Sequence, residues 1–90
     1  MKFDYLIIGA GTAGCVLANR LSEDSKNNVA IFEAGKNSDI WKVNMPLALL
    51  YTMHDPKYNY KYYSEPEPHL NNRKIYCPRG KMIGGCSAHN

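Results

Sequence analysis

Residues 4–14, DYLIIGAGTAG, constrain the fold of this chain more than any other stretch. The apolar run from Tyr5 to Ile8 predicts a strand that leads directly into a GxGxxG pattern. In such a pattern the first glycine permits a tight turn, the second lets backbone approach a pyrophosphate, and the third lets a helix pack close to the sheet. Phosphate then binds the free N–H groups at the helix N-terminus. We therefore predict a dinucleotide site at Gly9, Ala10, Gly11, Thr12, Ala13 and Gly14.

The residues after Gly14 predict the rest of a βαβ unit. Apolar side chains recur at helical spacing from Thr12 to Leu21, at Ala13, Val16, Leu17 and Leu21. A polar turn over residues 23–28 precedes a second apolar run, Val29 to Phe32. We expect an α/β chain: a parallel pair, about Phe3 to Ile8 and Val29 to Phe32, joined by this helix in a right-handed crossover. It is an incomplete Rossmann-like fold with an irregular extension.

Glu33 ends the second predicted strand, 19 positions after Gly14. At that distance the strand tip returns to the ligand, and an acidic side chain can bond both ribose hydroxyls. A solvated acid at a strand end is the alternative, but the strands, glycines, helix and acid all occur in the expected order. The residues themselves predict an unphosphorylated adenine dinucleotide and leave FAD and NAD both open.

Length, charge and cysteine usage exclude several classes of protein. Ninety residues suffice for one small domain at most, and the net charge of +3 does not form a nucleic-acid footprint. The three cysteines, Cys15, Cys77 and Cys86, have no zinc-like spacing. The N-terminal apolar run is too short for a signal peptide or a membrane span. We expect a cytoplasmic protein without metal, nucleic acid or membrane partners.

The middle of the chain predicts packing elements. Asp39 is a candidate cap for a short helix to Asn44, and Pro46 a candidate first residue of a helix through Met53. Trp41, Leu47, Leu49 and Leu50 are interpreted as core or interface residues. Tyrosines alternate at positions 58, 60 and 62, which predicts a strand with one packed face. The EPEP run at 65–68 predicts an extended corner, with solvated acids rather than a catalytic pair.

A second glycine-rich stretch closes the chain, RGKMIGGCSAHN at 79–90. A Gly-Gly pair followed by small residues lets backbone approach a ligand closely, and Ser87 is a candidate cap for a helix beginning beyond it. Alone it would be a flexible turn. Two glycine-rich loops of the phosphate-binding type in one short chain, the second flanked by Arg79 and Lys81, are harder to dismiss as simple turns.

Together these blocks resemble the glucose-methanol-choline (GMC) oxidoreductases, FAD-dependent enzymes that oxidise alcohols such as choline. The resemblance covers nearly all 90 residues, in the order and spacing of that family's N-terminal part. It rests on DYLIIGAGTAGCVLANRLSED at 4–24, FEAG at 32–35, YYSEPEPHLNNR at 62–73 and PRGKMIGGCSAHN at 78–90.

The resemblance implies FAD rather than NAD, held by the first glycine loop, Glu33 and the adjoining Ala34. It implies that the second block, Gly84, Gly85, Cys86, Ser87, His89 and Asn90, lies against the flavin. In some members a histidine at the position of His89 is bonded covalently to the 8-methyl carbon of the flavin; in others FAD is bound without a bond. Covalent attachment and simple packing therefore both remain open for His89.

Length separates this chain from the family, whose members have several hundred residues. Their substrate domain and catalytic His pair follow the point where residues 1–90 stop, and His54 and His69 lie outside the catalytic motif. We expect residues 1–90 to be the N-terminal part of an FAD domain and to be inactive alone. Three alternatives stay open: a truncated inactive relative, a piece of an active choline or alcohol oxidase or dehydrogenase, and an FAD- or NAD-binding module of another flavoprotein class.

Overall fold

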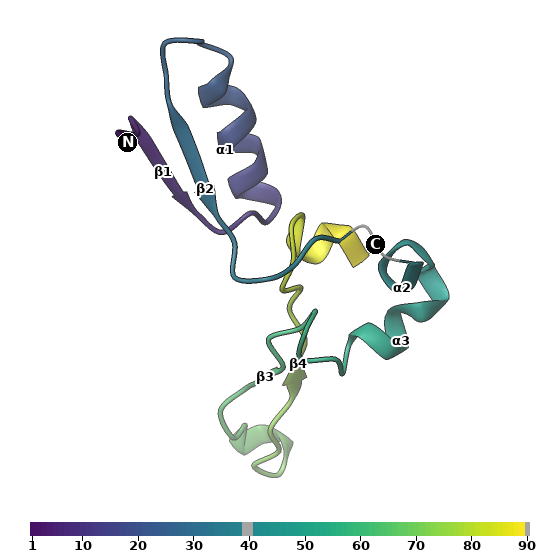
Figure 1. Ribbon diagram of the computed structural model, residues 1–90. Coiled ribbons are helices and arrows are strands. Elements are labelled where there is room, and N and C mark those ends of the chain that lie inside the picture. Colours follow the sequence, from purple (N-terminus) through teal and green to yellow (C-terminus); the bar gives the residue numbers. More distant parts are fainter. Residues whose placement is uncertain (39–40, 90) are drawn as a thin grey trace.

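A computed structural model describes residues 1–38 and 41–89, apart from the side chain of Lys42. The chain begins with the predicted βαβ unit: β1 (Tyr5–Ile8), α1 (Thr12–Ser22) and β2 (Val29–Phe32). The strands pair in parallel, with Tyr5 opposite Val29 and Ile8 opposite Phe32. This confirms the predicted α/β class (Figure 1). Phe3 does not join the strand, because the pairing begins where the N–H groups of Asp4 and Tyr5 both donate to the Asn28 carbonyl.

The face of α1 that meets the sheet differs from the predicted one. Gly14 is buried, and Ala18 and Leu21, one and two turns further on, are half-buried. Val16 and Leu17 of the predicted face remain 57% and 52% exposed. Gly14 decides the orientation, since a Cβ there would lie 1.9 Å from the Gly9 carbonyl oxygen. The helix is apolar on two sides, and only one of them is covered by the described residues.

Three short elements follow: α2 (Trp41–Asn44), a 3₁₀ turn η1 (Pro46–Ala48) and α3 (Leu49–Thr52). Pro46 stands at the start of η1, where its missing N–H costs nothing. The expected helix from Pro46 to Met53 is thus divided into a 3₁₀ turn and an α turn. Val43, Ala48 and Thr52 are buried here. The predicted Asp39 cap lies outside the described residues.

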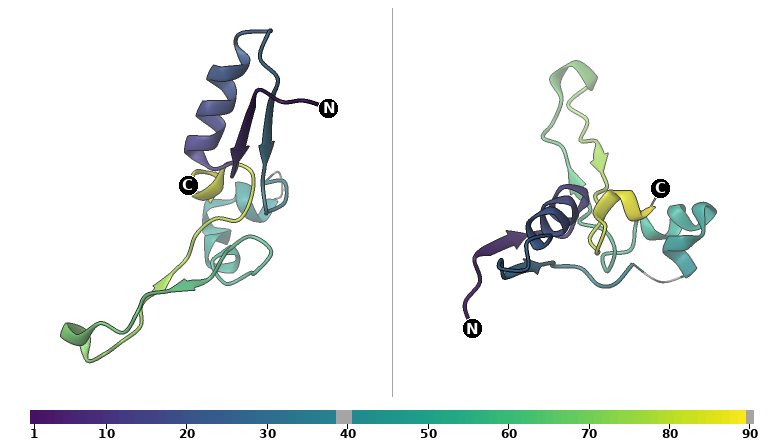
Figure 2. Two further views of the ribbon diagram at one scale, coloured as in Figure 1. Left: turned by 90° about the vertical axis from the view of Figure 1, so that its left-hand side faces the viewer. Right: turned by 90° about the horizontal axis from the view of Figure 1, so that it is seen from above.

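A two-stranded arm projects from the rest of the molecule (Figure 2). Antiparallel β3 (Tyr62–Tyr63) and β4 (Tyr76–Cys77) form it, with the 3₁₀ turn η2 (Pro68–Leu70) near its tip. The predicted strand through Tyr58 is wrong, because Lys61 has a left-handed φ of +56° that interrupts it. The corner at 65–68 is extended as far as Glu67 and then turns into η2 at Pro68.

The last segment returns to the first unit and completes the small core. Lys36 and Met82 form an isolated parallel bridge, and the Ile83 N–H donates to the Lys36 carbonyl at 3.2 Å. The described part of the chain then closes with the 3₁₀ turn η3 (Gly85–His89), which lies beside the N-terminus of α1. Among the described residues the buried apolar side chains are Ile7, Ala10, Val43, Ala48 and Met82.

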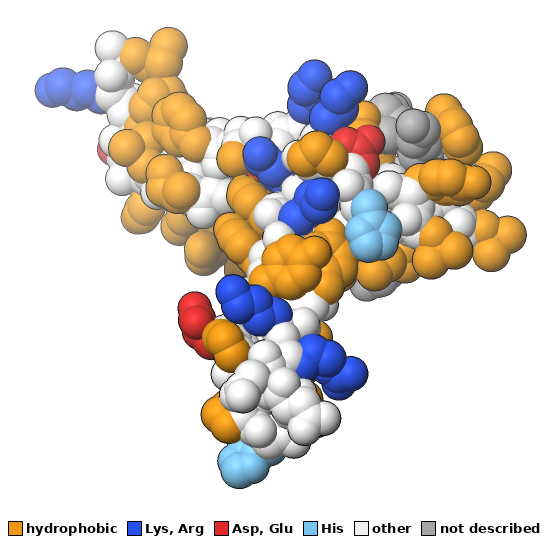
Figure 3. All heavy atoms as spheres, turned by 90° about the horizontal axis from the view of Figure 1, so that it is seen from below, with side chains coloured by type: hydrophobic (Ala, Val, Ile, Leu, Met, Phe, Trp, Pro, Cys, Tyr) orange, Lys and Arg blue, Asp and Glu red, His pale blue; other side chains and the backbone are white. Residues whose placement is uncertain are grey.

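With so few buried side chains, the molecule is less compact than a typical domain of the same length. Its radius of gyration is 16.4 Å, against about 12 Å for a compact domain of this length. Apolar side chains gather on the surface over both the βαβ end and the α2–α3 end (Figure 3). Beyond the terminal Met1, the most exposed at the first end are Leu6, Ile8, Val16, Leu17 and Phe32, and at the second Trp41, Leu47, Leu50 and Tyr51. A surface of this kind is typical of a piece that packs against further protein.

Candidate dinucleotide site

The first glycine loop has the geometry of a phosphate cradle. Gly9 turns the chain out of β1 with a φ of +96°, a conformation that side chains rarely adopt. Gly11 caps α1 with an ordinary φ of −75°, and a Cβ placed on it would meet no atom within 4 Å. The first turn of α1 carries no acidic residue. Open space therefore lies beside Gly11, at a helix N-terminus that favours an anion.

Glu33 connects the two strand ends of the site. Its Oε2 accepts a hydrogen bond from the Ala10 N–H, and its Oε1 accepts one from the Gly35 N–H, both at 2.8 Å. The sequence did not predict these bonds. A carboxylate has roughly four lone-pair sites, so two are left for further donors. Glu33 thus lies beside the glycine loop, as a ribose contact requires, and also holds that loop to residue 35.

The second glycine block lies directly on the first. The Gly84 N–H donates to the Ala10 carbonyl at 2.7 Å. A Cβ on Gly85, which has a φ of +59°, would lie 3.0 Å from the Gly11 Cα. The hydroxyls of Thr12 and Ser87 are hydrogen-bonded to each other. Two segments more than seventy residues apart in the chain therefore form one backbone surface.

Ser87 stays a predicted helix cap, because the helix that it would begin lies beyond the described residues. Ser87 itself lies inside η3, and its hydroxyl is taken by Thr12 across the two loops. The turn starts at Gly85, because the left-handed Gly84 and Gly85 reverse the chain there.

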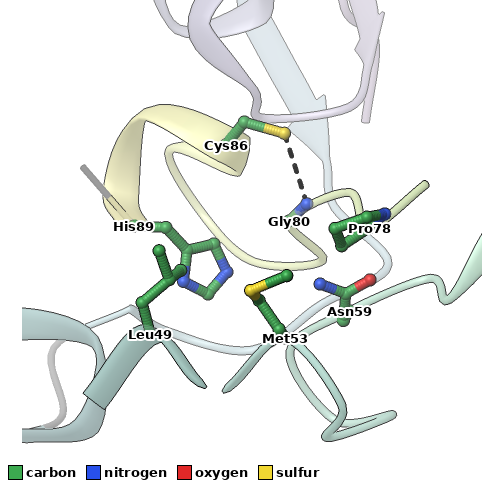
Figure 4. A pocket seen from close by; sticks show the side chains of 7 residues that line it. All are labelled: Leu49, Met53, Asn59, Pro78, Gly80, Cys86 and His89. Carbon is green, nitrogen blue, oxygen red and sulfur yellow. Dashed lines mark hydrogen bonds between the residues drawn. The ribbon is translucent and has the colours of Figure 1, made fainter. Parts of the chain in front are cut away.

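A cavity of about 220 Å³ lies behind the second block (Figure 4). Its walls are mostly apolar, from Leu49, Met53, Pro78 and Cys86, with the polar side chains of Asn59 and His89. The Cys86 thiol accepts the Gly80 N–H at 3.3 Å. His89 bonds Thr52 through Nδ1, whereas its buried Nε2 has no hydrogen-bond partner among the described residues.

Most of the predicted site residues come together in this structure. Residues 9–14, 33 and 84–87 surround the glycine-loop surface, and His89 reaches the adjoining cavity. Ala34 is exposed in the loop that follows β2. Asn90 lies outside the described residues. Sequence reasoning did not find Thr52 and Asn59, which are buried polar residues of the cavity region; Asn59, inside a tyrosine-rich run, gave no signal of burial.

Two observations bear on other kinds of site. In the described part of the chain, no three His, Cys, Asp or Glu side chains gather closely enough to hold a metal ion. No helix among residues 1–38 and 41–89 is long and apolar enough to cross a bilayer.

Comparison with known proteins identifies the class. Residues 7–38 match the model of an NAD(P)-binding Rossmann-like domain. Over its whole length the chain is 56% identical to an oxygen-dependent choline dehydrogenase of Sinorhizobium fredii and 53% identical to one of Rhizobium etli. It spans 16% of the length of each of these relatives.

Solved structures agree with the sequence relatives. The chain resembles pyridoxine 4-oxidase from Mesorbium loti with a TM-score of 0.89 and 32% identity, over 99% of this chain and 17% of that one. It resembles formate oxidase with a TM-score of 0.84 and 34% identity, over 98% and 16%. The fold is that of the dinucleotide-binding part of a flavoprotein. The chain belongs to the GMC oxidoreductases, a family whose cofactor is FAD, which confirms the predicted family and removes the alternative of another flavoprotein class.

Proposed function

We propose that residues 1–90 are the N-terminal part of the FAD domain of a GMC alcohol oxidoreductase. One observation carries the proposal: the open space beside Gly11 lies where the α1 N-terminus, Glu33 and the second glycine block meet. This arrangement suits a pyrophosphate on the loop, with a ribose near Glu33. The FAD-dependent relatives favour a flavin over a nicotinamide dinucleotide.

The reaction we propose for the complete protein is oxidation of a small alcohol. FAD supplies the hydride-accepting chemistry, and the protein supplies binding and orientation. The relatives at 50–56% identity are choline dehydrogenases, which supports choline or a similar amino alcohol as substrate. Residues that bind the substrate and move its proton are then contributed by sequence beyond residue 90. Within residues 1–90 the proposed role is to hold the cofactor.

His89 is proposed to face the flavin and, in the complete protein, to carry it covalently. Its buried Nε2 lines the cavity and has no partner in the part of the chain that the structure describes, and an unpaired buried polar atom is uncommon in folded proteins. A group bound in the cavity would provide that partner. Acid precipitation distinguishes covalent attachment from simple packing, because only a covalently bound flavin stays with the precipitated protein. In the His89→Ala variant, such a flavin should instead appear in the supernatant.

The test of FAD binding compares two glycines in a chimera, with residues 1–90 replacing the matching segment of the Sinorhizobium relative. Gly11→Val places its side chain in open space, so we expect parent-like unfolding and loss of flavin. The Cβ that Gly14→Ala adds would lie 1.9 Å from the Gly9 carbonyl oxygen, so we expect this variant to be destabilised. Flavin retention by Gly11→Val, or nicotinamide binding in place of flavin, would refute the assignment.

A further inference from the structure

Thr52 is the only side chain in the described part of the structure that hydrogen-bonds His89. Its hydroxyl lies 3.2 Å from His89 Nδ1 and 3.1 Å from the Leu49 carbonyl oxygen. Thr52 is completely buried at the end of α3, and His89 arrives from η3, 37 positions later in the sequence. The other ring nitrogen, Nε2, is also buried and has no hydrogen-bond partner within residues 1–38 and 41–89.

The hydroxyl has one hydrogen, and its placement determines the tautomer of the ring. A carbonyl can only accept, so the bond to Leu49 uses the Thr52 hydrogen, and the Thr52 oxygen accepts from Nδ1–H of His89. Both bonds then form together. If Thr52 instead donates to Nδ1, the bond to Leu49 is lost and Nε2–H becomes a buried donor without a partner. The first arrangement makes two hydrogen bonds and leaves no donor unpaired, whereas the second makes only one. The first is therefore favoured, with the hydrogen on Nδ1.

The cavity wall opposite carries the complementary polar group. Asn59 Oδ1 accepts hydrogen bonds from the backbone N–H groups of Lys61 at 2.9 Å and Arg79 at 3.0 Å. These two bonds settle which end of the amide is oxygen, so the NH₂ group points toward the cavity (Figure 4). The cavity therefore presents one donor, from Asn59, and one acceptor, Nε2 of His89, between apolar walls.

We propose that Thr52 is a positioning residue that holds neutral His89 as the Nδ1–H tautomer and directs the Nε2 lone pair into the cavity. This inference rests on the proposed function for its meaning: Nε2 is then the atom that His89 presents to the cofactor, either as a hydrogen-bond acceptor or as the point of attachment. The tautomer itself is a property of the protein without any ligand.

The experiment uses the same chimera, labelled with ¹⁵N-histidine, without and with FAD. Nitrogen chemical shifts and couplings distinguish a protonated from an unprotonated ring nitrogen, and the signals that vanish in His89→Ala belong to His89. Thr52→Ser keeps the hydroxyl, and Thr52→Val removes it at nearly the same volume. Ser22→Ala is the matched control, since the Ser22 hydroxyl makes the same bond to the carbonyl three residues back, at 3.1 Å, without a histidine.

We expect the neutral parent, Thr52→Ser and Ser22→Ala to show one species with hydrogen on Nδ1, and Thr52→Val to show both tautomers. Where the parent carries acid-stable flavin, we expect Thr52→Val to form it about tenfold more slowly, the effect of losing one hydrogen bond. A parent ring protonated on Nε2, or an unchanged tautomer in Thr52→Val, would overturn the inference. Thr52→Ala replaces Thr52→Val if that variant unfolds.

These outcomes separate the inference from the proposed function. A parent that shows the Nδ1–H tautomer but releases its flavin in acid contradicts covalent attachment and leaves the role of Thr52 standing. A parent with acid-stable flavin and hydrogen on Nε2 supports the proposed function and contradicts the role of Thr52.

Discussion

Glu33→Gln tests whether the Glu33 carboxylate holds the site together before any ligand arrives. The carboxylate accepts two backbone N–H groups, from Ala10 and Gly35. A glutamine has one oxygen, so its NH₂ group must face one of these N–H donors. That donor loses its partner, at a cost of about 1–3 kcal/mol, and the other bond loses the contribution of the charge, roughly 1 kcal/mol. The expected local destabilisation is about 2–4 kcal/mol.

Amide hydrogen exchange in the flavin-free chimera measures this directly. A loss of about 2–4 kcal/mol corresponds to exchange roughly 30- to 700-fold faster at the amides of Ala10 and Gly35, up to the limit set by global unfolding. The control is Glu23→Gln. Glu23 pairs with Arg20 at 2.7 Å on an exposed helix surface, where such a pair contributes about 0–1 kcal/mol.

Exchange at both amides within threefold of the parent would refute the structural role of Glu33. Flavin affinity is measured separately. A loss of affinity without faster exchange would leave the ribose contact as the sole function of Glu33. Faster exchange without a loss of affinity would leave the structural role alone.

Three further outcomes are expected. Gly35→Ala should destabilise the chimera by at least about 1–3 kcal/mol in urea unfolding, because its Cβ would lie 2.0 Å from the Lys81 carbonyl oxygen; a parent-like midpoint would contradict this packing. Partial burial and, to a smaller extent, the nearby Tyr63 raise the pKa of Tyr76 above 10.0, so the stabilising contribution of Tyr76 is present below pH 10 and is lost as pH rises through the raised pKa. Tyr76→Phe should therefore reduce the loss of stability at alkaline pH. An alkaline unfolding curve that this substitution leaves unchanged would count against the prediction. Residues 1–90 alone should aggregate, because Ile8 and Leu47 are 83% and 85% exposed. They should also show no alcohol oxidase activity, because the residues proposed to bind the substrate and move its proton lie outside them; a cooperative thermal transition with hydrogen peroxide release from a small alcohol would disprove this.

The βαβ unit was predictable because its signals are local. Hydrophobic periodicity and the glycine spacing locate the ends of β1, α1 and β2 to within one residue, apart from the start of the first strand, which was predicted two residues too early at Phe3. The packing face of α1 was not predictable from hydrophobicity, since the helix has two apolar sides. The side that carries Gly14 packs on the sheet, because only glycine lets α1 come so close to the Gly9 carbonyl. The size of the apolar side chains would have favoured the other side, which carries Val16 and Leu17.

The tyrosine-rich run shows how a tertiary contact overrides a local pattern. Alternating tyrosines predict a strand, and the stacked rings of Tyr60 and Tyr62, 5.3 Å apart, do share a face. The backbone between them nevertheless turns, because the buried Asn59 amide binds the N–H of Lys61 and that of Arg79, which is 20 positions away. No pattern within five or six residues carries that information. Thr52 was missed for the same reason, since its partner His89 is 37 positions away.

The contact between the two glycine blocks also has a consequence for the order of folding. Residues 9–14 leave the ribosome before residues 84–87, but the surface they form is complete only when Gly84 has bonded the Ala10 carbonyl and Gly85 lies against Gly11. At about 5–20 residues per second, the early loop waits several seconds for its counterpart. The apolar surfaces of β1, α1 and β2 are exposed throughout that interval, and they are still exposed when the second block has docked. During synthesis, this unit therefore exposes its apolar surface for longer than the segments that follow it.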